Sequence, residues 1–125
     1  MKDPTVMKRA ATTKTRGTRT PTRLSKERLA EMIEEATVDA YDDSEQATGW
    51  FTMFEEHVEL PFETKVLGAT VTVASIDLRD SGQIVAICTR GRDRQAIALV
   101  DLPLPSPKPA GTDWIEAYRY WLSRR

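Results

Sequence analysis

The stretch "SEQATGWFTMFEEHVELPF", residues 44–62, contains the clearest helical pattern in the chain and the residue that ends it. Apolar side chains recur there at the spacing of one helix face: Ala47, Trp50, Phe51, Phe54 and Val58. Asp43 or Ser44 can cap the start of this helix, and Pro61 cannot continue it. We therefore expect a helix from Ser44 to about Val58 that buries an aromatic stripe.

The chain before this helix divides into a basic part and a second amphipathic helix. In "LSKERLAEMIEEATVDAY", residues 24–41, Ser25 is a suitable N-cap, and apolar residues follow at helical spacing from Leu29 to Ala40. Residues 1–22 are rich in Thr, Lys and Arg and have almost no large apolar side chains. Such a segment does not bury enough surface to offset its ordering entropy. We expect a disordered basic tail over residues 1–22 and a single domain over residues 23–125.

Four short strands are predicted after the aromatic helix. They are "ETKVLG" (63–68), "ATVTVASIDL" (69–78), "QIVAICT" (83–89) and "QAIALVDL" (95–102). The second strand changes its apolar parity after Val73, which indicates a bulge near Ala74–Ser75. Turns are predicted at "DSG" (80–82) and around Gly91 in "RGRDR" (90–94). Antiparallel strands at this spacing predict a small, strongly curved sheet or an SH3-like barrel.

A last helix is predicted after the extended segment "PLPSPKPAGT", residues 103–112. It should start at Thr112 or Asp113, with Glu116 as a capping-box partner. The fold class is therefore α+β, with two N-terminal helices and one C-terminal helix against the sheet. The expected core consists of Trp50, Phe51, Phe54, Phe62, Val71, Val73, Ile84, Ile87, Ile97, Leu99, Trp114, Tyr118 and Trp121.

The sequence lacks the motifs of the common enzyme classes. It has no P-loop, no G-x-S-x-G and no G-x-G-x-x-G. His57 is the only histidine and is interpreted as a surface or helix-end residue. Cys88 lies between apolar neighbours, so we expect a packed thiol rather than a reactive one. We predict a protein that is not an enzyme.

The single cysteine also bears on where the protein works. One thiol excludes an internal disulfide and fits a reducing cytoplasm. No apolar run approaches the roughly 20 residues that a membrane helix needs, so no membrane partner is expected.

Charge is strongly segregated along the chain. Residues 1–28 have a net charge of +7 and residues 29–125 a net charge of −8. Residues 29–63 hold eleven carboxylates and not one Lys or Arg. Seven of these acids form two groups around the ends of the aromatic helix: Asp42, Asp43 and Glu45 at its start, and Glu55, Glu56, Glu59 and Glu63 at its end.

Helix electrostatics treats the two groups differently. Acids at a helix start are stabilised by the helix dipole and by capping, whereas acids at a helix end repel the dipole and one another. A cation would relieve that repulsion, but the charges alone favour a solvated acidic face, since clusters of like charge usually face water. Calcium takes six to eight oxygen ligands, and the chain contains no EF-hand loop to supply them. Glu45 and Glu56 are about 16 Å apart along a helix, so any cations need at least two places.

The basic residues suggest an alternative function. Phosphates of a nucleic acid, or an acidic protein partner, can be contacted by the tail and by the turn at residues 90–94. The candidate residues are Arg16, Arg19, Arg23, Arg90, Arg92 and Arg94. The tail contains no aromatic residue, so stacking on bases is not indicated.

Residues 24–122 resemble the small bacterial calcium-binding proteins of the CcbP type. The shared landmarks are a Tyr before a Glu, a Gly-Trp pair, an acidic amphipathic helix and a Leu-Pro-Phe entry into the first strand, here Tyr41, Glu45, Gly49, Trp50, Leu60, Pro61 and Phe62. The resemblance implies a calcium buffer or sensor that binds Ca²⁺ without an EF-hand. The implied ligands are Glu45, Glu56, Glu59 and Glu63, with Asp42 and Asp43 beside them.

Overall fold

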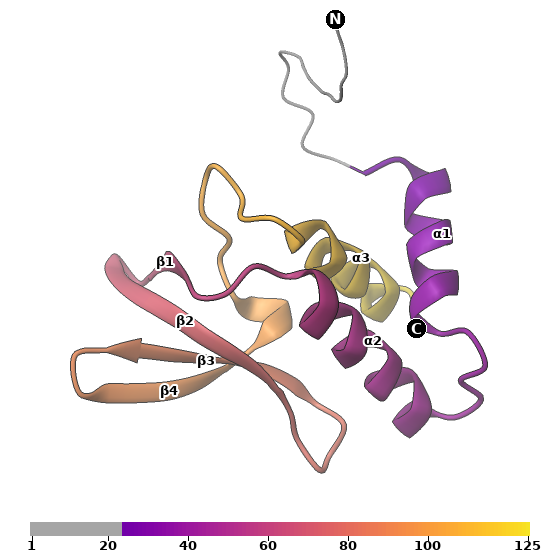
Figure 1. The fold of residues 1–125 in the computed structure, drawn as a ribbon, viewed down its shortest axis with the longest axis horizontal. Coiled ribbons are helices and arrows are strands. Elements are labelled where there is room, and N and C mark those ends of the chain that lie inside the picture. The colour runs from indigo at the N-terminus through magenta and orange to yellow at the C-terminus, as the bar shows by residue number, and fades with distance from the viewer. Residues whose placement is uncertain (1–23) are drawn as a thin grey trace, which may run out of the picture.

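The computed structural model describes residues 24–125 as three helices and one antiparallel sheet of four strands. In chain order the elements are α1 (Lys26–Ala36), α2 (Asp43–His57), β1 (Phe62–Val66), β2 (Ala69–Leu78), β3 (Ile84–Arg90), β4 (Asp93–Ala98), the 3₁₀ turn η1 (Leu99–Asp101) and α3 (Thr112–Ser123). The predicted α+β class is confirmed. Figure 1 shows the helices gathered at one side of the molecule and the β1–β2 and β3–β4 hairpins extending from the other.

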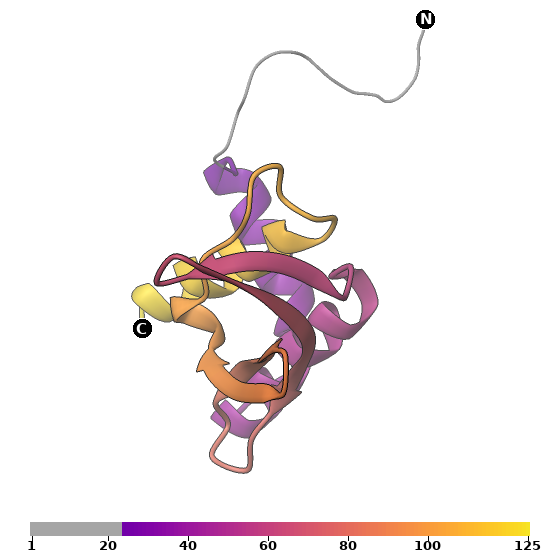
Figure 2. The same ribbon diagram turned by 90° about the vertical axis from the view of Figure 1, so that its left-hand side faces the viewer.

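The sheet is a meander in which each strand pairs with its neighbour in sequence, in the order β1-β2-β3-β4. Its register shifts between Val73 and Ser75, so the predicted bulge is confirmed. Figure 2 shows the strong bend of the sheet, with the β1–β2 hairpin above and β4 below. Among residues 24–125 no ladder joins β4 to β1. The sheet is therefore open, and the expected SH3-like barrel is not confirmed.

Glycines with positive φ form the turns between strands. The predicted turn at "DSG" contains Gly82 with φ 91°, and the turn around Gly91 has φ 60° there. The last predicted strand is too long, because β4 ends at Ala98 and η1 follows. The Arg119 guanidinium of α3 donates to the carbonyls of Leu99 and Leu102, which favours a turn of the backbone at this point.

Local hydrogen bonds set the helix starts. Ser25 accepts from the Arg28 N–H at 3.0 Å, as expected for an N-cap. The cap of α2 is Asp42 rather than Asp43 or Ser44. For α3, the start at Thr112 is confirmed, but the predicted capping box of Glu116 is wrong. Glu116 instead pairs with Lys108 at 2.6 Å.

A glycine occupies the cap position of α3 for a steric reason. Gly111 has φ 84°, and a Cβ there would lie 1.9 Å from the carbonyl oxygen of His57. The end of α2 and the start of α3 are therefore in direct backbone contact, and the Glu59 N–H donates to the Ala110 carbonyl at 2.9 Å beside them. This contact fixes the position of the acidic end of α2.

The core centres on Trp50, which is fully buried. Its ring centroid lies 5.5–6.4 Å from the rings of Phe54, Trp114, Tyr118 and Trp121. Nine of the expected core residues are buried, and Phe51, Val71, Ile97 and Trp121 are half-buried. Leu29, Met32 and Ala36 of the apolar stripe predicted for the first helix are also buried, whereas the sequence did not identify Leu102 and Ile115 as core residues. No helix within residues 24–125 has the length and apolarity needed to cross a membrane.

Candidate metal-binding surface

Three carboxylates stand at the start of α2, and each already has a partner in the protein. The Asp42 carboxylate accepts from the Glu45 N–H at 2.8 Å, and the Glu45 carboxylate accepts from the N–H groups of Tyr41 and Asp42 at 2.8 and 3.2 Å. This reciprocal pair is a capping box. Asp43 accepts from the Arg125 guanidinium at 2.6 Å. The structural explanation of this first acidic group is therefore confirmed.

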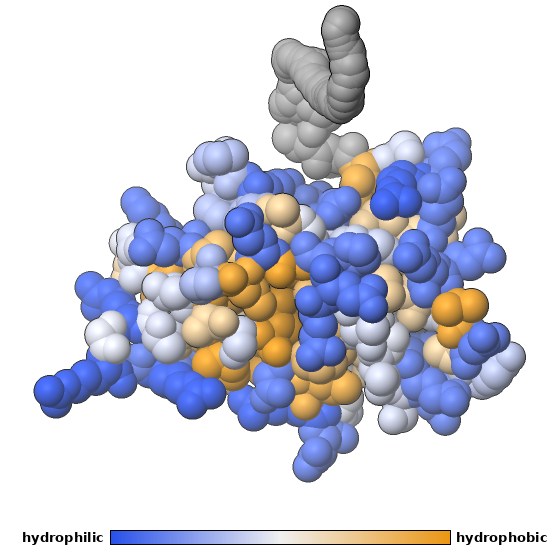
Figure 3. All heavy atoms as spheres, in the orientation of Figure 1, coloured by the Kyte–Doolittle hydropathy of each residue, from blue (hydrophilic) through white to orange (hydrophobic). Residues whose placement is uncertain are grey.

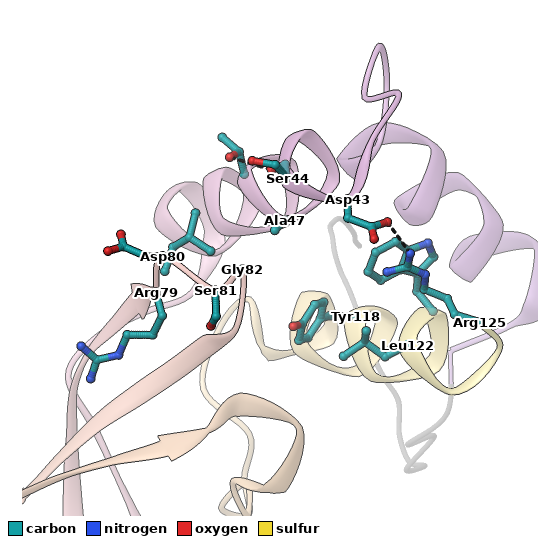
Figure 4. Close-up of a pocket in the computed structure, with 13 residues that line it drawn as sticks. Asp43, Ser44, Ala47, Arg79, Asp80, Ser81, Gly82, Tyr118, Leu122 and Arg125 are labelled. Carbon is teal, nitrogen blue, oxygen red and sulfur yellow. Dashed lines mark hydrogen bonds and ion pairs between the residues drawn. The ribbon is translucent and has the colours of Figure 1, made fainter.

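A pocket of about 430 Å³ opens beside this group, between the start of α2, the β2–β3 turn and the end of α3. Figure 4 shows the ion pair of Asp43 and Arg125 at one side of the pocket and Asp80 at the opposite side. Burial raises the pKa of Tyr118 in the pocket wall, with the nearby Arg125 acting in the opposite direction. Asp80 was predicted only as part of a turn. Only the folded meander places it at this pocket, so no local sequence signal identifies it.

The second acidic group surrounds the end of α2. Glu56 and Glu59 are exposed, and Glu56 lies 3.8 Å from His57 Nε2. Glu63 is exposed in β1, where it pairs with Thr72 across the ladder. Glu59 follows the C-cap of α2, and the Leu60–Pro61 cis peptide bond separates it from Glu63 on the strand. These carboxylates therefore come from the last turn of α2, from the segment that follows it and from the start of β1.

His57 lies in the same region, beside Glu56. It is the last residue of α2, it is exposed, and its ring stacks on Trp114 with centroids 4.9 Å apart and planes at 11°. The interpretation of His57 as a helix-end residue is confirmed. Cys88 is 4% exposed, and burial raises the pKa of its thiol, so the expectation of a packed cysteine is also confirmed.

The structure does not gather the acids into one preformed centre. Within residues 24–125, no three His, Cys, Asp or Glu side chains stand close enough together to share a metal ion. All eleven carboxylates of residues 29–63 are exposed, and the ion pairs made by this set in the described chain involve Arg28, His57 and Arg125. The result is a broad negative surface supplied with oxygen donors, which are the ligands that hard divalent cations prefer.

The basic candidates lie elsewhere. Arg90, Arg92 and Arg94 are exposed at the β3–β4 hairpin turn, which extends away from the helices. Arg16, Arg19 and Arg23 lie outside the described residues. The structure therefore brings the three hairpin arginines together but does not place them near either acidic group.

Comparison with known proteins identifies the family. The sequence profile of the CcbP family, described as calcium binding, matches residues 30–122. No curated protein matches the chain at a significant level. A calcium-binding protein solved in its calcium-binding form is 24% identical with a TM-score of 0.64, over 78% of this chain and 91% of that one. The crystal structure of CcbP from Anabaena is 23% identical with a TM-score of 0.62, over 83% of this chain and 96% of that one.

At such identities the two solved structures establish a shared fold and nothing finer. The sequence profile covers most of the chain, from the middle of α1 to the end of α3. This protein therefore belongs to the CcbP family of calcium-binding proteins, and Ca²⁺ is the metal ion that its membership indicates.

Proposed function

We propose that this protein is a non-enzymatic calcium-binding protein, a buffer or a sensor, that binds Ca²⁺ through exposed acidic side chains without an EF-hand. The observation that carries the proposal is the family match over residues 30–122. The chemistry of the surface supports it, because residues 29–63 present eleven exposed carboxylates and no Lys or Arg. Such a surface offers hard oxygen ligands and attracts divalent cations.

The proposed ligands divide between the two ends of α2. At its end they are Glu56, Glu59 and Glu63, and at its start they are Asp42, Asp43 and Glu45. The end of the helix is the stronger candidate, because its unpaired carbonyls add oxygen donors and its dipole favours a cation. At the start, Asp42 and Glu45 already accept backbone N–H groups, and Asp43 is paired with Arg125.

Binding at the end of α2 requires some rearrangement of side chains. Glu56 and Glu59 are exposed, so their carboxylates can reorient without disturbing the core. Backbone carbonyls and water would supply the remaining oxygens, since calcium accepts a flexible ligand shell. Magnesium demands a tighter octahedron and gives up its water reluctantly. We therefore expect the surface to prefer calcium over magnesium.

Isothermal titration tests this function directly. The full chain is titrated with calcium and then with magnesium in about 0.15 M salt, where exposed charges are largely screened. We expect saturable calcium binding and weaker magnesium binding. A Glu56→Gln, Glu59→Gln double variant should bind calcium more weakly than the matched control Glu34→Gln, Glu35→Gln, which removes the same charge from α1. Equal calcium affinity in the two double variants would remove Glu56 and Glu59 from the ligand set.

A further inference from the structure

The two hairpins form a groove that the acidic surface does not include. Its volume is about 330 Å³, and its lining comes from the β1–β2 hairpin and from β3 and β4. Val66, Leu67 and Val71 form one wall, and Cys88, Arg94 and Ile97 contribute to the other. We call this the hairpin groove. In Figure 3, hydrophobic atoms gather in the middle of this face, and hydrophilic atoms surround them on all sides.

One side of the hairpin groove is an edge strand with free backbone groups. Within the described chain, β4 pairs only with β3. The two-residue turn between Arg90 and Asp93 makes them a hydrogen-bonded pair, and such pairs alternate along an antiparallel ladder. The N–H and C=O groups of Arg94, Ala96 and Ala98 therefore point away from β3, toward the open edge.

The opposite side of the groove carries an unusual hydrophobic residue. Leu67 is 102% exposed at the tip of the β1–β2 hairpin. Its φ is +52°, a backbone conformation that a leucine rarely adopts. A fully exposed leucine in an unfavourable backbone conformation does not stabilise the folded state, because it buries no apolar surface. It does offer apolar contact area to a ligand in the groove.

The charge at the rim indicates the kind of ligand. Arg90, Arg92 and Arg94 are all exposed, and Asp93 is the only acid among them. This rim is basic in a chain whose residues 29–125 carry a net charge of −8. The ligand that complements it is acidic, contains apolar side chains and is extended enough to pair with an edge strand.

We propose that the hairpin groove binds an extended acidic peptide segment of a partner protein, which adds to β4 as a fifth strand. Main-chain hydrogen bonds to the β4 edge would hold the peptide, alternate side chains would enter the apolar groove, and acids would meet the arginines. The chain's own residues 1–22 are basic, so they do not complement the basic rim of the groove. Nucleic acid fits poorly, because no aromatic residue lines the groove for bases to stack on.

A display library of random octapeptides, selected on the full chain, tests this proposal. Enriched peptides should combine Asp or Glu with apolar residues, and their affinity should fall as salt is raised. For the tightest peptide, fluorescence anisotropy should show at least a tenfold loss of affinity with Arg94→Glu and with Ala96→Pro. Proline at 96 removes an outward N–H and leaves the ladder to β3 unbroken. The control Arg79→Glu, at the opposite end of β2, should bind like wild type.

Each alternative outcome has its own signature. Failure to enrich any octapeptide, enrichment of peptides without acids, or equal binding to all variants would overturn the proposal. A single-stranded oligonucleotide that binds with the same Arg94→Glu sensitivity, while no peptide does, would assign the groove to nucleic acid. Self-association lost in Ala96→Pro would assign the edge to a second copy. If Ala96→Pro unfolds by circular dichroism, Arg94→Glu and Leu67→Asp decide the question.

Discussion

Gly49 of α2 lies against the last residue of α1, and its missing side chain allows the two helices to approach each other there. A Cβ at this position would lie 2.0 Å from the carbonyl oxygen of Ala36, at the end of α1. That oxygen belongs to the backbone and has little room to move. The pair Gly49–Trp50 therefore has a packing role: glycine leaves room for the backbone of α1, and Trp50 fills the core behind it.

Replacing Gly49 with alanine should destabilise the protein, although this replacement usually stabilises a helix. Alanine normally stabilises a helix interior by about 1 kcal/mol relative to glycine. Here Gly49→Ala should destabilise the protein by about 1–3 kcal/mol, because the new methyl group overpacks the contact with α1. Urea denaturation measures the change, with Thr48→Ala on the exposed side as the control. A Gly49→Ala variant as stable as wild type would mean that the helices separate at no cost.

Phe54 tests the aromatic core. It is 1% exposed, and its ring centroid lies 6.2 Å from that of Trp50 and 5.4 Å from that of Tyr118. Phe54→Ala should cost about 3–5 kcal/mol, because the cavity has rigid aromatic walls. Phe51→Ala, at a half-buried position on the same helix, should cost less. A Phe54→Ala variant that unfolds at the wild-type denaturant midpoint would remove Phe54 from the core.

At the scale of elements, patterns within one segment could be predicted and contacts between segments could not. The aromatic stripe of α2 and the parity change at the β2 bulge are visible in the residues themselves. The 3₁₀ turn at Leu99–Asp101 is not, because it is associated with Arg119 of α3, far away in sequence. The same limit applies to Gly111, whose role depends on the backbone of His57.

Replacing Arg125 should change the calcium affinity only if the ion binds at the start of α2. Arg125 donates to Asp43 at 2.6 Å, so a calcium ion bound at Asp43 must displace it. Arg125→Gln should therefore raise calcium affinity a few-fold if the start of α2 binds calcium. Arg124→Gln is the matched control, since Arg124 packs over the Tyr120 ring. Equal calorimetric affinities for these two variants would exclude Asp43 as a ligand and leave the end of α2.

At the scale of the whole molecule, the fold brings together segments that are far apart in the sequence. The expected domain limits and the six metal ligands were derived from charge, pattern and family resemblance. The parity change after Val73 indicates a bend in the sheet, but no local pattern shows that this bend brings the β2–β3 turn to the start of α2 and the end of α3. This is why Asp80 and the hairpin groove were not anticipated, whereas the acidic groups were.

We propose that residues 23–125 fold as one domain without residues 1–22. Deleting residues 1–22 should leave the thermal midpoint within about 5 °C of the full chain, a shift that corresponds to roughly 1 kcal/mol in a domain of this size. Differential scanning calorimetry of the two proteins measures the difference. A larger fall would show that the basic segment stabilises the fold, and the acidic surface of residues 29–63 would be its expected contact.

The central claim is that the acids at the end of α2 bind calcium. In calcium-free buffer, Glu56→Gln with Glu59→Gln should raise the thermal midpoint, because two negative charges leave a repulsive helix end. In saturating calcium, wild type should gain a stability that grows as RT ln(1 + [L]/Kd), and the double variant should gain less. A solvated acidic face predicts instead a small rise in both buffers.

Thermal midpoints of wild type and this double variant, each with and without millimolar calcium, are therefore the most direct test. The account predicts that calcium raises the wild-type midpoint and that the double variant is the more stable protein only when calcium is absent. A wild-type midpoint that does not move in millimolar calcium would contradict calcium binding and the role given to these glutamates.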